Sequence, residues 1–194
     1  MNFASPDLTH LGRSFRPVKA MSLRIPPPTM PDWENWSIGE RMAQANAYLC
    51  DTLHVEEHPR GSNTGPEVDA FLAFAGLHAE PWCIAMQIYL ANKCGVGESR
   101  LPPIYMRAST VQVAKWARDK DKTIDFRVVK RGDIFIRLDA DGKHGHAGCV
   151  LEVRADGTMR TIEGNTNSDG SREGYAVCRH VRPLGYANEF VRFW

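Results

Sequence analysis

The sequence has no long apolar run, no strong excess of one charge and no closely spaced pair of cysteines. No stretch approaches the roughly 18 apolar residues of a membrane-spanning helix, so a membrane protein is not expected. The formal net charge of +1 favours neither nucleic acid nor an anionic membrane as a partner. The 194 residues, 43% of them hydrophobic, suit one compact domain with an appended arm.

The first 20 residues also lack the apolar stretch of a secretory signal. Charged or titratable side chains interrupt them at Asp7, His10, Arg13, Arg16 and Lys19. We therefore expect a chain that is made as a soluble cytoplasmic protein. To act outside the cytoplasm, it would need export without a cleaved signal, or lysis of the cell.

The five cysteines are odd in number and include no Cys-x-x-Cys pair, so a disulfide framework is not expected. A cysteine is most often a small buried apolar residue. This interpretation is preferred for Cys50, Cys94, Cys149 and Cys178. The fifth cysteine, Cys83, stands in a different context.

Prolines are concentrated in residues 1–36, which are predicted to form an arm without regular helix or strand. These prolines are Pro6, Pro17, Pro26, Pro27, Pro28 and Pro31. Trp33 and Trp36 are expected to anchor the end of the arm to a domain that covers residues 37–194. A segment for partner binding or delivery is the alternative for the arm.

The spacing of apolar residues changes from helical to alternating at about residue 126. Helices are predicted to begin after Ser37, at Pro66, at Pro81 and after Ser109. Strands are predicted over residues 133–138, 146–153, 158–163, 175–181 and 189–193, with a loop over 164–174. Helices first and an antiparallel meander second indicate the α+β class.

Cys83 follows Pro81 and Trp82 at the predicted start of the third helix. Backbone N–H groups and the positive end of the helix dipole stabilise a thiolate there, and the thiolate is the nucleophilic form. The backbone N–H of Cys83 is also expected in an oxyanion hole, with Asn63 and Gln87 as candidates for the second donor. The alternative is that Cys83 only packs beside Trp82.

A candidate base stands in the segment Gly145-His146-Ala147-Gly148, at the start of a predicted strand. Histidine can take a proton from a thiol and later give one to a leaving amine. The glycines are expected to leave room for a substrate or a partner chain. His144 competes as the base but falls in the predicted hairpin turn. A hydrogen-bonded histidine at a sheet edge is the alternative.

A histidine base works best when a third group fixes its tautomer. Glu163 and Asn165 alternate with Ile162 at the end of a predicted strand, so both are expected on one face beside His146. We predict that Glu163 orients the imidazole and that Asn165 is a second orienting group. For Glu163, a solvated strand end is the alternative.

Two patterns match metal sites only in part. His144-x-His146 would need a distant third ligand, such as Cys83, to bind zinc. The Asp139-x-Asp141 pattern lacks the later ligands of a calcium loop, and a plain Asp-Gly turn is preferred. Neither a metal nor a cofactor is predicted.

Taken together, these stretches resemble CHAP domains, the cysteine, histidine-dependent amidohydrolases/peptidases that are related to NlpC-type and papain-like enzymes. The residues that carry the resemblance are Pro81-Trp-Cys83-Ile-Ala, Arg131-Gly-Asp133-Ile-Phe, Gly145-His146-Ala-Gly-Cys-Val and Ile162-Glu163-Gly-Asn165, within residues 60–183. The segment Ser62–Pro66 is similar to a bacterial and phage branch of these hydrolases. The sequence departs from the family pattern at Ile84, Met86 and Gln87, which are therefore expected to shape the pocket.

The resemblance implies a papain-like α+β fold and cleavage of a peptidoglycan amide bond by Cys83, His146 and Glu163, helped by Asn165. The enzyme would be an amidase or endopeptidase, either a lytic enzyme of a phage or prophage or an antibacterial effector. An effector would have an immunity protein and a delivery machinery as partners. The alternative is a catalytically inactive CHAP-like binding or structural module.

Overall fold

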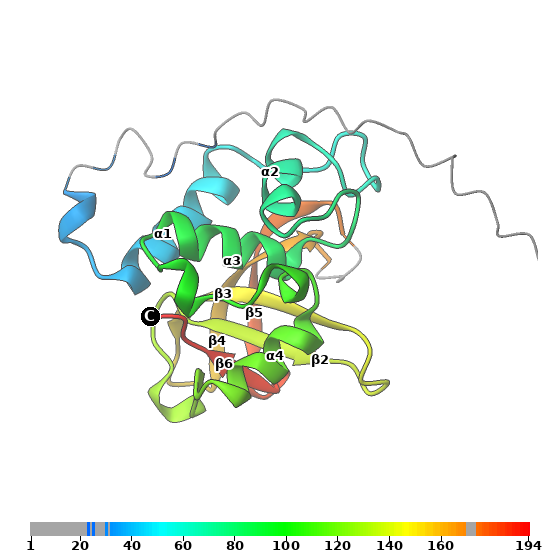
Figure 1. Ribbon diagram of the computed structural model, residues 1–194. Helices are drawn as coiled ribbons and strands as arrows, with labels where there is room; N and C mark the ends of the chain where they lie inside the picture. The colour runs from blue at the N-terminus through cyan, green and yellow to red at the C-terminus, as the bar shows by residue number, and fades with distance from the viewer. Residues whose placement is uncertain (1–22, 24, 26–29, 31, 170–173) are drawn as a thin grey trace, which may run out of the picture.

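The computed structural model describes residues 23, 25, 30, 32–169 and 174–194. Helices and a six-stranded antiparallel sheet make up this part of the chain, which is the α+β arrangement expected from the sequence (Figure 1). The helices are α1 Ile38–Asp51, α2 Pro66–Phe74, α3 Cys83–Lys93 and α4 Thr110–Asp119. The strands are β1 Thr123–Ile124, β2 Ile134–Leu138, β3 Gly145–Val153, β4 Thr158–Thr166, β5 Ala176–Pro183 and β6 Glu189–Val191. None of the described helices has the length and apolar character needed to span a membrane.

Serine side chains begin two of the helices, as the sequence predicts. Ser37 Oγ accepts a hydrogen bond from the backbone N–H of Glu40 at the start of α1 (3.2 Å). Ser109 Oγ accepts one from the backbone N–H of Gln112 at the start of α4 (3.3 Å). Each such cap satisfies a backbone donor and stabilises its helix by about 1 kcal/mol.

The strands pair in the order β1-β6-β2-β3-β4-β5, and the two faces of the sheet carry different cores. Helices α1 and α3 pack on one face, where Ala147 and Cys149 of β3 join the main core. A smaller core covers the opposite face and contains Phe135, Val150, Met159 and Phe190. The sheet therefore holds β3 and β4 in its interior, below α3 (Figure 1).

Strand β4 is longer than the sequence predicts. It continues to Thr166, whereas a loop was expected from residue 164. A β-bulge lies between Glu163 and Thr166, and Asn165 takes a left-handed backbone conformation there (φ 56°). A bulge inserts an extra residue and interrupts the alternation of side chains. The two-residue period that placed Glu163 and Asn165 on one face therefore does not hold across this bulge.

The end of the N-terminal arm packs on the domain. Trp33 is buried in the 3-10 turn Trp33–Asn35, and its ring lies 5.9 Å from that of Trp36. Partly buried apolar residues of the arm also contact the main core, namely Leu23, Ile25 and Met30. The predicted anchoring by the two tryptophans is confirmed. The prolines that predict an irregular arm lie outside the described residues.

Candidate active site

Cys83 is the first residue of α3. Trp82 occupies the N-cap position without a capping side chain, and Pro81 precedes it instead of lying in the first helical turn. The first backbone N–H groups of a helix have no partner within the helix. They are therefore oriented to stabilise an anion at the Cys83 sulfur, or an oxyanion that forms beside it. The cysteine retains 6% exposure.

Trp82 fixes the start of α3. Its indole is fully buried, and its Nε1 donates a hydrogen bond to Glu57 Oε1 (2.9 Å) in the loop before α2. The indole also packs over Gly164, where a Cβ would lie 2.5 Å from the Trp82 ring and 2.9 Å from Met86 Cε. The absence of a side chain at Gly164 thus allows the helix that carries Cys83 to lie close to β4.

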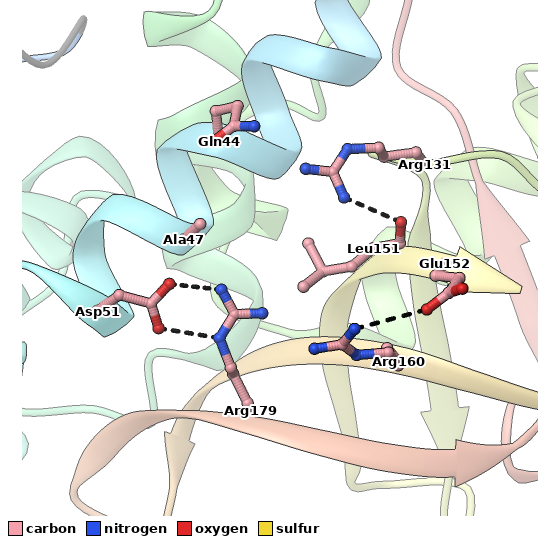
Figure 2. A pocket seen from close by; sticks show the side chains of 8 residues that line it. All are labelled: Gln44, Ala47, Asp51, Arg131, Leu151, Glu152, Arg160 and Arg179. Carbon is pink, nitrogen blue, oxygen red and sulfur yellow. Dashed lines mark hydrogen bonds and ion pairs between the residues drawn. The ribbon is translucent and has the colours of Figure 1, made fainter. Parts of the chain in front are cut away.

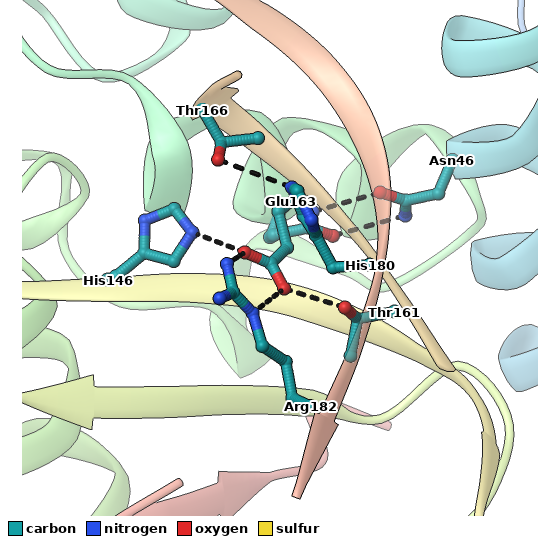
Figure 3. Close-up of polar contacts among 8 residues, drawn as sticks. Asn46, His146, Thr161, Glu163, Thr166, His180 and Arg182 are labelled. Carbon is teal, nitrogen blue, oxygen red and sulfur yellow. Dashed lines mark hydrogen bonds and ion pairs between the residues drawn. The ribbon is translucent and has the colours of Figure 1, made fainter. Parts of the chain in front are cut away.

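His146 is the second residue of β3, and its imidazole is buried beside Glu163 (Figure 3). Its Nε2 lies 2.9 Å from Glu163 Oε2. The other ring nitrogen, Nδ1, is buried, and no described residue lies within hydrogen-bonding geometry of it. Since Glu163 occupies Nε2, Nδ1 is the nitrogen that remains for the Cys83 sulfur.

Cys83 and Glu163 both shift the pKa of His146. Burial alone would lower this pKa, but hydrogen bonding and charge from Cys83 and from Glu163 raise it to about 9. The structure therefore brings together the three residues that the sequence analysis selected, from the start of α3, the start of β3 and the middle of β4.

Several donors surround the Glu163 carboxylate (Figure 3). Thr161 Oγ1 donates to Oε1 (2.6 Å), and Arg182 donates from Nε to Oε1 (3.0 Å) and from Nη2 to Oε2 (2.7 Å). Burial tends to raise the pKa of Glu163, but His146, Arg182 and Thr161 lower it to about 2. An ionised carboxylate only accepts hydrogen bonds. Neutral His146 therefore carries its proton on Nε2 and keeps the Nδ1 lone pair for a thiol.

Arg182 is a member of the site that the sequence analysis missed. It comes from β5, which pairs with β4 in a register that places His180 opposite Thr161. Its guanidinium also lies over the Tyr186 ring, 4.5 Å from the ring centroid. The signal that the sequence offers for this residue is its position two residues after His180, because alternate residues of a strand lie on the same face. The contact with Glu163 depends on the register of β4 and β5, because a shift by one residue would turn Arg182 to the other face of the sheet.

Glycines of β3 provide space for the protein's own side chains. Gly148 lies opposite Glu163 in the β3–β4 pair, and a Cβ there would lie 2.7 Å from Glu163 Cγ and 2.7 Å from the Phe135 ring. At Gly145, a Cβ would lie 2.7 Å from Thr110 Oγ1 of α4. The expectation that these glycines leave room for a substrate or a partner chain is therefore wrong, because the space is already filled.

Replacing Gly148 by alanine is expected to displace Glu163. The new Cβ would also lie 2.9 Å from the backbone oxygen of Ile162, so both the strand and the carboxylate must move. Such overpacking costs about 1–3 kcal/mol. We expect a lower melting temperature and slower alkylation of Cys83 by iodoacetamide. The control is Gly185→Ala, where nothing lies within 4 Å of the new Cβ. Equal melting and alkylation in both variants would contradict this role of Gly148.

The pH dependence of stability should report the His146–Glu163 pair. Glu163 has its pKa lowered from 4.5 to about 2, so its contribution is present above pH 4.5 and is lost as the pH falls towards 2. His146 has its pKa raised from 6.5 to about 9, so its contribution is complete below pH 6.5 and is lost as the pH rises through 9. Urea unfolding measured across this range should show both losses. Both should be weaker in Glu163→Gln, and an unchanged profile in that variant would refute the assignment.

Asn165 lies in a setting different from that of Glu163. With Glu57, Gly61, Asn63, Pro81 and Gly174 it lines a pocket of about 90 Å³, beside the segment that leads into α3. Asn63, one predicted second donor of an oxyanion hole, is thus placed near this segment. The role of Asn165 as a second orienting group for His146 stays a prediction.

Gln87 is not available as an oxyanion donor, so that prediction is wrong. Its side-chain amide is buried between α1 and α3, where Nε2 donates to Asn46 Oδ1 (2.9 Å) and Oε1 accepts from Asn46 Nδ2 (3.1 Å). Ile84 and Met86 are also fully buried in the main core. All three residues pack the helix in the interior, so the expectation that they shape a substrate pocket is wrong as well.

His144 lies in the hairpin between β2 and β3, as predicted. Its exposed imidazole contacts Asp141 through Nδ1 and Oδ2 (2.6 Å), and the backbone N–H of Lys143 donates to Asp141 Oδ1 (2.9 Å). Ligand atoms of Asp139, Asp141 and His144 lie within 4.8 Å of one another. The hydrogen bonds of Asp141 to the hairpin backbone are those of a plain turn, the interpretation preferred from the sequence.

The four other cysteines are unpaired packing residues, as expected. Cys94 and Cys149 are fully buried, and burial raises the pKa of Cys94 to about 12 and that of Cys149 further still. Cys50 and Cys178 are partly buried, and burial raises the pKa of each of these thiols too. These four side chains therefore remain protonated thiols at neutral pH.

A larger pocket, of about 400 Å³, lies between α1 and the strands β3 to β5 (Figure 2). Its lining residues are Gln44, Ala47, Asp51, Arg131, Leu151, Glu152, Arg160 and Arg179. Four of its charged groups form two pairs: Arg179 Nε donates to Asp51 Oδ1 (2.9 Å), and Arg160 lies 3.7 Å from Glu152. This pocket shares no residue with the Cys83 site, so the chemistry of Cys83 is assigned without it.

No family model, no curated protein and no solved structure matches the chain. The residues of the site and their contacts are therefore the basis on which a function is inferred.

Proposed function

We propose that the chain is a cysteine-dependent hydrolase that cuts an amide bond of peptidoglycan. Cys83 is the nucleophile, His146 is the base and then the acid, and Glu163 orients the imidazole. The observation that carries the proposal is the buried contact of His146 Nε2 with Glu163, which leaves Nδ1 for Cys83 at the start of α3. Arg182 donates hydrogen bonds to both oxygens of the Glu163 carboxylate.

Proton transfer from the Cys83 thiol to His146 Nδ1 gives a thiolate beside an imidazolium, the form that the raised pKa of His146 favours below about pH 9, and the sulfur then attacks the amide carbonyl carbon. The new S–C bond makes a tetrahedral oxyanion, which the backbone N–H of Cys83 stabilises. As the C–N bond breaks, His146 Nδ1–H protonates the leaving amine and a thioester remains. Water then gives a proton to His146 Nδ1 and attacks the thioester carbonyl carbon. As the C–S bond breaks, the carboxylic acid is released and the sulfur shares the proton on His146 again, as at the start of the cycle.

Glu163 and Arg182 have separate roles in this cycle. Glu163 accepts the Nε2–H of His146 in both of its protonation states and stabilises the imidazolium when it forms. Arg182 stabilises the Glu163 carboxylate in the ionised form, and so the proton remains on the histidine. Asn165, at the bulge that follows Glu163, is proposed as the second polar group that supports this arrangement.

The resemblance to CHAP domains supports peptidoglycan peptides as the substrate class and a papain-like form of the α+β fold. The cysteine at a helix start, followed in the chain by strands that carry the histidine and the glutamate, has the order that the resemblance implies. Such an enzyme would act in the cell wall, as a lytic enzyme of a phage or prophage or as an antibacterial effector that is neutralised by an immunity protein.

The test uses purified sacculi and mass spectrometry of the released fragments. Untreated protein is expected to release muropeptides with one new amine and one new carboxyl group, whose masses identify the bond. Protein alkylated with iodoacetamide should release none, because Cys83 is then blocked. Release that survives complete alkylation of Cys83 would overturn the proposal. Binding to sacculi without release, with Cys83 no more reactive at pH 6 than free cysteine, would favour a binding module.

A further inference from the structure

Glu57 is a buried carboxylate that the proposed mechanism does not use. It lies in the loop before α2, is 2% exposed, and accepts a hydrogen bond from Trp82 Nε1 at Oε1. The other carboxylate oxygen, Oε2, is buried and has no hydrogen-bond partner among the described residues. Burying a carboxylate without adequate partners is costly. A ligand that supplies the missing donor would offset this cost.

The unpartnered oxygen belongs to a residue that lines the small pocket beside the active site. Neutral polar side chains, Asn63 and Asn165, and Pro81 share this pocket with Glu57. None of the described lining residues is cationic, so Glu57 is the only charged group among them. A volume of about 90 Å³ is enough for a small group such as an ammonium. The pocket thus combines negative charge, hydrogen-bond acceptors and small size.

The pocket is also physically coupled to the nucleophile. Trp82, which donates to Glu57, immediately precedes Cys83 and occupies the N-cap of α3. Pro81 forms part of the pocket wall, two residues before the reactive sulfur. A group that binds at Glu57 therefore lies beside the segment that leads into Cys83.

We infer that this pocket is a subsite for a primary ammonium group of the substrate, and that Glu57 Oε2 is its anionic acceptor. The inference rests on the proposed function, because it names the part of the peptide that is held next to the scissile amide. An ammonium is small and offers three hydrogen-bond donors. Its positive charge complements the Glu57 carboxylate, which has no cationic partner among the described residues of the pocket. In a peptide it is either the α-amino terminus or a side-chain amine, and both present the same chemistry to Glu57.

The first arm of the test measures binding without hydrolysis. Ethylammonium chloride is titrated into the protein, with potassium chloride as the salt control, and the indole N–H resonances are followed by NMR. The Trp82 indole bonds to Glu57, so its resonance should shift with ethylammonium only. Glu57→Gln keeps an acceptor for Trp82 but removes the charge, so its indole resonance should not respond. Glu56→Gln, at the half-exposed neighbouring residue, should respond as the wild type does.

The second arm measures kinetics on a set of matched peptides. One peptide has both amines free, one has its α-amine acetylated, and one has its side-chain amine acetylated. Acetylation of the amine that binds should raise the KM of the wild type about 10- to 100-fold, as expected for loss of a charged hydrogen bond. The KM of Glu57→Gln should already be raised for the free peptide and should not change on acetylation, with kcat less affected. The acetylation that raises the KM shows whether the α-amine or the side-chain amine binds at Glu57.

The two arms separate failure of this inference from failure of the proposed function. If the wild type hydrolyses sacculi, but ethylammonium does not shift the Trp82 resonance and neither acetylation changes KM, then the ammonium subsite is wrong and the hydrolase stands. If no hydrolysis occurs but ethylammonium binds in a Glu57-dependent manner, the subsite stands and the proposed reaction is wrong. Ethylammonium that shifts wild type and Glu57→Gln equally would also overturn the subsite.

Discussion

Replacing Cys83 by alanine is expected to lower the rate of muropeptide release by about 10³-fold or more, because the covalent step has no other nucleophile. The substitution removes only a sulfur atom at a position that retains slight exposure, so the fold should persist. The release of fragments from sacculi and the thermal melting curve are measured on the same preparation. A melting temperature close to that of the wild type would assign the loss to chemistry.

The chain offers a matched control for this substitution. Cys50 lies partly buried on α1, outside the site, and burial raises its pKa to about 12. Cys50→Ala should retain wild-type release, and its alkylation by iodoacetamide should remain confined to Cys83 at neutral pH. Undiminished release by Cys83→Ala, or equal losses in the two variants, would refute Cys83 as the nucleophile.

Replacing Glu163 by glutamine is expected to lower kcat/KM by about 10²- to 10⁴-fold. The glutamine amide can donate to His146 Nε2, which favours the tautomer with its proton on Nδ1. That tautomer cannot accept the proton of the Cys83 thiol. The substitution also leaves the Arg182 guanidinium without its anionic partner, so the melting temperature should fall as well.

The pH profile distinguishes this role of Glu163 from a purely structural one. In the wild type, kcat/KM should fall as the pH rises through about 9, where His146 loses the proton that the leaving amine needs. In Glu163→Gln this alkaline limb should move to lower pH, because the carboxylate no longer stabilises the imidazolium. The control is Glu152→Gln on β3, at an exposed side chain outside the site. An alkaline limb at the same pH in both variants would show that Glu163 does not set the pKa of His146.

The sequence alone determined the elements that depend on local interactions. Ser37 and Ser109 begin helices because a cap bonds to a backbone N–H only three residues away. The alternation of apolar residues after residue 126 identified β2 to β6, because one face of each must be buried, but not the two-residue strand β1. The order of Cys83, His146 and Glu163 in the chain was likewise available, with Cys83 and His146 at the start of their predicted elements and Glu163 at the end of its predicted strand.

Tertiary structure decided which side chains meet, because such contacts depend on the register and packing of segments that are far apart in the chain. The pairing of β4 with β5 brings Arg182 to Glu163, and the bulge at Asn165 ends the simple alternation. The packing of α1 against α3 places Gln87 against Asn46, which removes it from the site. Contacts of this kind depend on burial shared by distant residues, and no local pattern in the sequence specifies them.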